Sequence, residues 1–291
     1  MKKHRLLSNC TALIVMILIS VQYAYAENVI RLNGVEDPKA DYVIAVIDLA
    51  IKHLDKKYRI QRFDNEALSQ IRVREEINAG NLDVTWTSSN SEIEQLMQPI
   101  RIPLFKGLIG YRILIIRQGD QYKFDNIKTL EDLKKVSLGQ GTTWADTKIL
   151  EANGLHVVKT VKYPNLFYML DGGRFDAFPR GVSEPFEEIP RYPTLKLDVE
   201  KNLLIAYKMP FYLFVKNGNN VLAKDLETGL NLAIADGSFE KLFLSNKTVQ
   251  DVIEKSNIGN RRIINLENPT LSKETPVDRA ELWIDPQKLG K

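Results

Sequence analysis

Cysteine is nearly absent from the sequence, which excludes several kinds of chemistry. Cys10 is the single cysteine among 291 residues, and it precedes the apolar run 13–19. A cysteine that carries a lipid anchor would instead follow such a run, at the cleavage site. Without the segment 1–26 the chain has no thiol, so we expect neither disulfides nor thiolate catalysis. Its stability must come from an ordinary hydrophobic core.

Long hydrophobic runs are also missing. The run 13–19 is too short to span a bilayer, which takes about 20 apolar residues. Basic residues Lys2, Lys3 and Arg5 come before it, and the small-x-small pattern 24–26 comes after it. This order is typical of a signal peptide. We therefore predict export to the periplasm, with cleavage after Ala26.

Net charge is low once that segment is set aside. The chain has 40 Lys and Arg against 37 Asp and Glu, and residues 1–26 hold three of the bases and no acid, which leaves 37 of each sign. The pI of 8.7 therefore comes from the leader, and we expect no nucleic-acid partner. Two histidines, His53 and His156, remain outside the leader. Their spacing builds no metal site, so we predict no metal and no cofactor.

What the chain does have is a regular alternation of β-rich and helical stretches, which favours an α/β fold. Strands are predicted at 29–32, 58–63, 83–87, 110–117 and 136–138, and helices at 42–54, 69–79, 221–235 and 238–244. Thr129 with Asp132, and Thr143 with Asp146, have the spacing of capping boxes. The Gly-Gln-Gly sequence at 139–141 predicts a tight turn.

Four stretches carry a resemblance to a known family. They are Asn-Ala-Gly-Asn-Leu-Asp at 78–83, the segment 130–143 that ends in Gly-Thr-Thr, Gly-Gly-Arg-Phe-Asp-Ala at 172–177, and the helical pair at 230–239. In this order they resemble the type II periplasmic solute-binding proteins, and in particular the amino-acid-binding (family 3) branch. The resemblance implies two α/β lobes joined by two hinge crossover strands. Lobe 1 would comprise 27–112 and 208–267, lobe 2 would comprise 113–207, and 268–291 would be a surface tail.

The resemblance also indicates where a ligand would bind. In such folds ligands meet the loops that leave the strands at the interlobe cleft, and binding favours the closed state. A helix start attracts an anion, a tryptophan offers a flat apolar surface, and a guanidinium can grip a carboxylate with two hydrogen bonds. Each candidate also has a plainer role, as a cap, a core side chain, an ion pair or a solvated loop. The candidate ligand-binding residues are Glu36, Asp37, Trp86, Thr87, Ser88, Arg101, Thr142, Thr143, Trp144 and Arg180.

Two departures from the amino-acid-binding pattern bear on the ligand. The branch carries an arginine after the third strand for the α-carboxylate, whereas residues 91–96 contain no base. It also places an acid after the 172–177 segment for the α-amine, where Arg180 and Gly181 stand here. An unmodified α-amino acid therefore fits poorly, and we expect a small polar, anionic solute.

Three functions stay open at this point. The first is a monomeric binding protein that delivers its solute to a membrane transporter, and the second is a ligand-sensing subunit for a membrane signalling protein. The third, which we favour least, is an enzyme on the same scaffold. It would need a general acid or base in the cleft. Glu184 is the best candidate for that role in the sequence. We predict a binding protein and not an enzyme.

Overall fold

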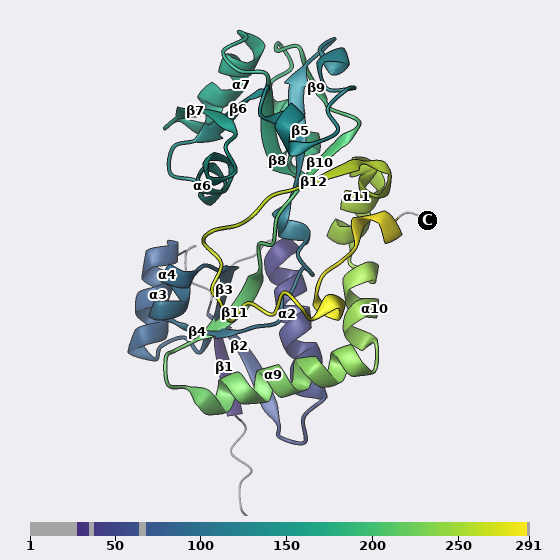
Figure 1. Ribbon diagram of the computed structural model, residues 1–291. Coiled ribbons are helices and arrows are strands. Elements are labelled where there is room, and N and C mark those ends of the chain that lie inside the picture. The colour runs from purple at the N-terminus through teal and green to yellow at the C-terminus, as the bar shows by residue number, and fades with distance from the viewer. Residues whose placement is uncertain (1–27, 35–37, 64–67, 290–291) are drawn as a thin grey trace, which may run out of the picture.

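The structure is a computed structural model that describes residues 28–34, 38–63 and 68–289. It shows two α/β lobes, one above the other, joined by a narrow middle (Figure 1). The predicted signal peptide and the candidates Glu36 and Asp37 lie outside the described residues. Within those residues, no helix has the length and apolar character needed to cross a membrane.

Lobe 1 combines parallel strands with one antiparallel insertion. β1 pairs with β2 in parallel, and β11 lies between β3 and β4, antiparallel to both. The Asp83 N–H donates to the Arg31 carbonyl over 2.9 Å, which places β3 beside β1. Lobe 1 thus has a two-stranded sheet β1-β2 and, next to it, a three-stranded sheet of order β3-β11-β4. The strands are β1 (Asn28–Asn33), β2 (Tyr58–Phe63), β3 (Val84–Ser88), β4 (Gln98–Ile100) and β11 (Phe211–Val215).

Lobe 2 likewise combines parallel and antiparallel strands. Its sheet has the order β7-β6-β8-β5-β10-β12, with β9 paired to the far end of β5. β6 is parallel to β7 and β8, whereas β5 is antiparallel to β8 and β10. Each lobe thus receives an antiparallel strand just after the chain arrives from the other lobe. The strands are β5 (Tyr111–Arg117), β6 (Ser137–Gly141), β7 (His156–Thr160), β8 (Ala177–Gly181), β9 (Leu197–Val199), β10 (Leu203–Ala206) and β12 (Arg262–Asn265).

The strand registers show which edge of each sheet faces the middle. β5 begins directly after the first crossing, and its Arg112 lies opposite Gly181, the last residue of β8. β11 begins directly after the second crossing, and its Phe211 lies opposite Ser88, the last residue of β3. The carboxyl ends of β3 and β8 therefore both lie at the hinge. In α/β sheets this is the edge where ligands bind.

The two crossings, 101–110 and 207–210, pack closely against each other. The Tyr207 N–H donates to the Gly110 carbonyl over 3.1 Å, and a Cβ on Gly110 would lie 2.0 Å from the Tyr207 carbonyl oxygen. Lys106 and Gly107 before it have φ values of 47° and 79°. A glycine at 110 therefore lets the two backbones touch.

Helices cover both faces of the lobe 1 sheets, with α2, α9 and α10 on one side and α3 and α4 on the other (Figure 1). α2 and α9 approach so closely that a Cβ on Gly229 would lie 2.1 Å from the Ala50 carbonyl oxygen. The helices are α2 (Pro38–Lys52), α3 (Gln70–Ala79), α4 (Ser91–Leu96), α5 (Leu130–Leu133), α6 (Ala145–Ala152), α7 (Tyr163–Asp171), α8 (Glu184–Glu188), α9 (Asn220–Ala235), α10 (Ser238–Ser245) and α11 (Lys247–Ser256).

The C-terminal tail packs against the hinge. After β12 it returns to lobe 1, where the Ser91 N–H donates to Thr270, and the Ile284 N–H donates to the Lys106 carbonyl over 2.8 Å. Leu282 is fully buried, and Trp283 packs on Gly107. The tail therefore contributes to the core of lobe 1 as well as to its surface.

One local prediction is confirmed and two are wrong. Thr129 with Asp132 forms the predicted reciprocal capping box. The second capping box does not form, because the N-cap of α6 is Trp144 and the Asp146 carboxylate binds Arg112 instead. The predicted turn at 139–141 is the end of strand β6.

Candidate functional site

The sequence-predicted candidates of lobe 2 lie at the hinge-facing end of its sheet. Thr142, Thr143 and Trp144 directly follow β6, and Arg180 is the penultimate residue of β8. Thr142 and Thr143 are exposed. Trp144 packs on Gly141 and stacks on Phe178, with ring centroids 6.2 Å apart. The structure brings Trp144 and Arg180 together, with the guanidinium carbon 5.0 Å from the indole centroid.

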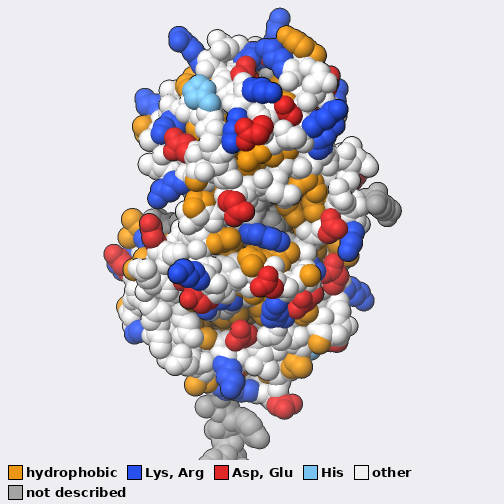
Figure 2. All heavy atoms as spheres, in the orientation of Figure 1, with side chains coloured by type: hydrophobic (Ala, Val, Ile, Leu, Met, Phe, Trp, Pro, Cys, Tyr) orange, Lys and Arg blue, Asp and Glu red, His pale blue; other side chains and the backbone are white. Residues whose placement is uncertain are grey.

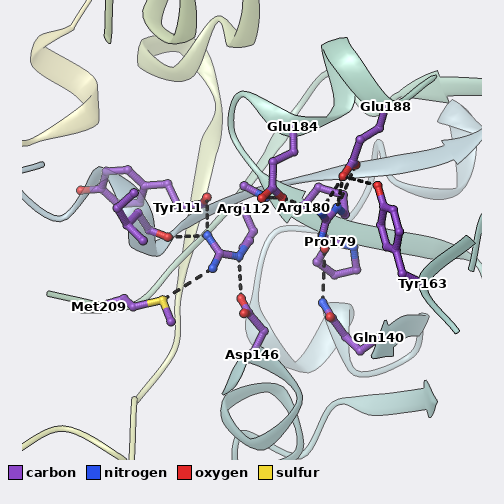
Figure 3. A network of polar contacts seen from close by, with 12 residues as sticks. Tyr111, Arg112, Gln140, Asp146, Tyr163, Pro179, Arg180, Glu184, Glu188 and Met209 are labelled. Carbon is purple, nitrogen blue, oxygen red and sulfur yellow. Dashed lines mark hydrogen bonds and ion pairs between the residues drawn. The ribbon is translucent and has the colours of Figure 1, made fainter. Parts of the chain in front are cut away.

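Arg180 is held by carboxylates of its own chain (Figure 3). Its Nε donates to Glu188 over 2.8 Å, and its second terminal nitrogen lies 3.0 Å from Glu184. The rings of Trp144, Phe178 and Tyr163 surround the guanidinium at 4.9 to 5.5 Å. The charge of Arg180 is therefore balanced within lobe 2. Glu184 is in turn tied down, since it also accepts the Gly181 N–H over 2.7 Å.

The second predicted cation, Arg101, is paired in the same way. It donates to Glu94 over 2.6 Å, and the Glu94 carboxylate also accepts the Ser89 hydroxyl over 2.7 Å. This cluster follows β3 and β4 in lobe 1, whereas Arg180 belongs to β8 of lobe 2. Neither arginine that the sequence singled out presents an uncompensated charge.

The remaining candidates lie on β3. Trp86, Thr87 and Ser88 form its last three residues, all half-buried. Trp86 and Thr87 line a cavity between β3 and α3. The structure thus divides the candidates between two places. One is the hinge-facing end of the lobe 2 sheet, and the other is the end of β3 in lobe 1.

A buried charge network lies at the hinge, and it was not predicted from the sequence. Arg112, only 8% exposed at the start of β5, donates to Asp146 of α6 over 2.6 Å and contacts the Met209 sulfur at 3.6 Å (Figure 3). The Tyr207 hydroxyl donates to the same carboxylate. The Asp146 side chain of lobe 2 therefore binds both the start of β5, just after the first crossing, and Tyr207 of the second crossing.

This buried environment shifts the pKa values of Asp146 and Tyr207. Burial alone would raise the pKa of Asp146, but the charge of Arg112 and the hydrogen bonds from Arg112 and Tyr207 together lower it. Burial raises the pKa of Tyr207 well above its ordinary value. Asp146 is therefore ionised and Tyr207 is neutral at physiological pH.

A cavity of about 160 Å³ lies between the lobes at the hinge. Lys39 and Tyr42 of α2 form its lobe 1 wall, and the turn from Gly181 to Glu184 forms its lobe 2 wall. Leu108, Ile109 and Arg112 of the hinge lie between these walls. Hydrophobic side chains also show at the waist of the molecule in Figure 2, with acidic and basic side chains interspersed around them.

Metal chemistry gains no support from the described part of the chain. No group of three or more His, Cys, Asp or Glu side chains there could hold an ion. The site instead consists of aromatic rings, hydroxyls and paired charges.

No protein-family model and no curated protein matches the sequence. Solved structures do match the fold. The probable amino-acid ABC transporter extracellular-binding protein ytmK from Bacillus subtilis is similar with a TM-score of 0.53 and 17% identity, over 77% of this chain and 99% of that one. YCKB from Bacillus subtilis has 20% identity and a TM-score of 0.49, over 78% and 92% of the two chains. An ancestral arginine-binding protein bound to arginine has 18% identity and a TM-score of 0.47, over 76% and 99%.

The sequence resemblance predicted a two-lobed α/β architecture with paired crossings, and the structure has it. The chain has the type II fold of the periplasmic solute-binding proteins.

Proposed function

We propose that this protein binds a small polar, anionic solute between its two lobes in the periplasm and delivers it to a membrane transporter. The observation that carries the proposal is the cavity whose walls come from lobe 1, the hinge and lobe 2. A ligand held by both walls gains its full contacts in one relative position of the lobes. Such a ligand shifts the population toward that position through its differential affinity.

The polar residues around this cavity suit a small hydrophilic molecule. Ser183, Asn246 and Thr248 provide hydrogen-bonding groups, and Tyr42 and Phe105 provide aromatic surface. Small-molecule sites combine apolar walls with a few polar groups in this way. The similar ytmK is described as a probable amino-acid ABC transporter extracellular-binding protein, which supports a transport role here.

Lys39 supports the anionic character of the solute. It is exposed in the first turn of α2, and within the described residues it has no carboxylate partner, only a contact 5.9 Å from the Phe211 ring. The N-terminus of a 15-residue helix adds partial positive charge at the same place. Arg101 and Arg180, by contrast, are neutralised by Glu94 and by Glu184 with Glu188. In this proposal Lys39, rather than Arg101 or Arg180, is therefore the cation that contacts the solute.

A thermal-shift screen of the chain from residue 27 onward tests this function. Amino acids, organic acids, short peptides and polyamines are compared, and a ligand at a hundred times its dissociation constant should add about 2.7 kcal/mol of stability. An organic acid should give the largest shift. Lys39→Ala should weaken its binding roughly tenfold, which corresponds to about 1.4 kcal/mol.

The matched control is Lys52→Ala at the other end of α2, where the lysine pairs with Asp48. That variant should bind as the unmodified chain does. A polyamine as the best ligand, or equal binding by the Lys39 variant, would contradict the proposed charge of the solute.

A further inference from the structure

A second cavity lies wholly within lobe 1, between α3 and the strands β1 and β3. Its volume is about 200 Å³. Arg74 and Gln70 of α3 line it on one side, and Asn33, Trp86 and Thr87 line it on the other. Asn33 ends β1 and Thr87 is next to last in β3, so the cavity reaches the hinge-facing edge of the sheet.

Arg74 is the charged group of this cavity. Throughout the described part of the chain, no hydrogen bond or ion pair holds its half-buried side chain. The neighbouring acids on α3 are already engaged, because Glu75 and Glu76 pair with Arg72 at 3.0 and 2.6 Å. A guanidinium that lines a cavity without a partner offers a fork of donors that matches a carboxylate.

Asn33 supplies a second unmatched group. The residue is 8% exposed, and its Oδ1 has no hydrogen-bond partner among the described atoms. Buried polar atoms in native proteins nearly always have a partner, so each exception calls for an explanation. A ligand that donates an O–H or N–H to Oδ1 would provide that partner.

The rest of the lining is apolar. Trp86 presents aromatic surface, and Leu68, Val73 and Met97 add aliphatic walls. These walls suit a carbon skeleton, whereas inorganic phosphate would leave them without contact. The cavity therefore combines a cation, an acceptor and an apolar surface.

We propose that this cavity binds a small organic carboxylate that also carries a hydroxyl or amide N–H donor. Arg74 pairs with the carboxylate, Asn33 accepts the donor, and Trp86 packs on the carbon skeleton. The site uses no residue of lobe 2. It is therefore independent of the solute site proposed between the lobes.

Titration calorimetry on the chain from residue 27 onward tests the proposal with lactate, 3-hydroxybutyrate and N-acetylglycine. At least one of the three should bind. For lactate, propionate lacks the hydroxyl and propane-1,2-diol lacks the carboxylate, so each should bind at least tenfold more weakly. Inorganic phosphate should show no comparable affinity.

Two substitutions connect the binding to the site. Arg74→Gln should weaken the best ligand at least tenfold, and Arg74→Lys should retain part of the affinity. Arg174→Gln, an exposed arginine of lobe 2, is the control for net charge and should change nothing. Circular dichroism verifies that each variant is folded.

Three results would overturn the proposal: no binding by any of the three acids, equal affinity in the Arg74→Gln variant, or phosphate binding as tight as that of the acids. Lys39→Ala separates this site from the interlobe site, because it should leave binding here unchanged. If Lys39→Ala alone abolished the binding, the carboxylate would belong to the interlobe site and this cavity would have no role.

Discussion

Replacing Asp146 by alanine removes the carboxylate that connects the second crossing to α6 and to the start of β5. Arg112, at the start of β5, would lose its ion pair of 2.6 Å, and Tyr207 of the second crossing would lose its acceptor. Both partners are buried. The variant would therefore leave a buried positive charge without compensation.

The expected loss of stability is large. The side chains of Arg112 and Asp146 are 10% and 17% exposed, so screening by solvent is weak. Removing one partner of such a pair typically costs about 3 to 5 kcal/mol. In a chain of this size each kcal/mol lowers the melting temperature by roughly 2 to 4 °C, so we expect a decrease of about 6 to 20 °C.

Urea unfolding followed by circular dichroism measures this loss, with Asp278→Ala, an exposed acid of the tail, as the control. The dependence on pH gives a second test. Because the pKa of Asp146 is lowered in the folded protein, its contribution is present above an unfolded pKa of about 3.9 and is lost as the pH falls below it. The difference in unfolding free energy between the unmodified protein and the Asp146→Ala variant should therefore become smaller in acid. A loss below about 1 kcal/mol at neutral pH, well under the range for buried pairs, would refute this account of the hinge.

Two further substitutions test the packing around the hinge. Gly110→Ala should destabilise the protein by at least about 2 kcal/mol, as overpacked sites do, because its Cβ would lie 2.0 Å from the Tyr207 carbonyl oxygen; urea unfolding measures this, and near-native stability would contradict the backbone contact. Leu282→Ala, at a position with 0% exposure, should cost about 2 to 5 kcal/mol. The exposed Val277 of the same tail should tolerate alanine, and equal effects at the two positions would show that the tail is not part of the core.

Local signals in the sequence predicted much of the fold. The strand at 58–63 has the bounds predicted for it, and Gly80 ends α3 in the left-handed conformation that glycine allows. These features depend on residues close together in the chain. α11 and β12 were missed, because α11 is mostly polar and β12 is a four-residue strand that depends on pairing with β10.

The errors have a common physical origin in tertiary contacts. Gly139 and Gly141 looked like turn residues, but a Cβ there would lie 2.2 Å from Phe175 and 2.4 Å from Trp144. They are glycines because aromatic rings pack on the strand. Similarly, Asp146 has the spacing of a cap but binds Arg112, which lies 34 residues away.

The candidate site was the hardest part to predict. Arg101 and Arg180 were chosen by their position after strands, and the acids that neutralise them stand seven and eight residues away in sequence. Arg74 gave no signal, because its lack of a partner depends on where Arg72 directs Glu75 and Glu76. Whether an arginine side chain has an ion-pair partner depends on the folded structure, so the sequence alone could not show it.

The distance between the lobes tests the central claim most directly. Asn78 of α3 and Lys148 of α6 are exposed on different lobes, and the chain from residue 27 onward has no native cysteine, so cysteines at these two positions can carry spin labels. Double electron–electron resonance is then measured with and without the organic acid that gives the largest thermal shift. We predict that the ligand moves the distance distribution to one shorter, narrower peak. A distribution that stays unchanged at saturating ligand would contradict solute binding by closure of the two lobes.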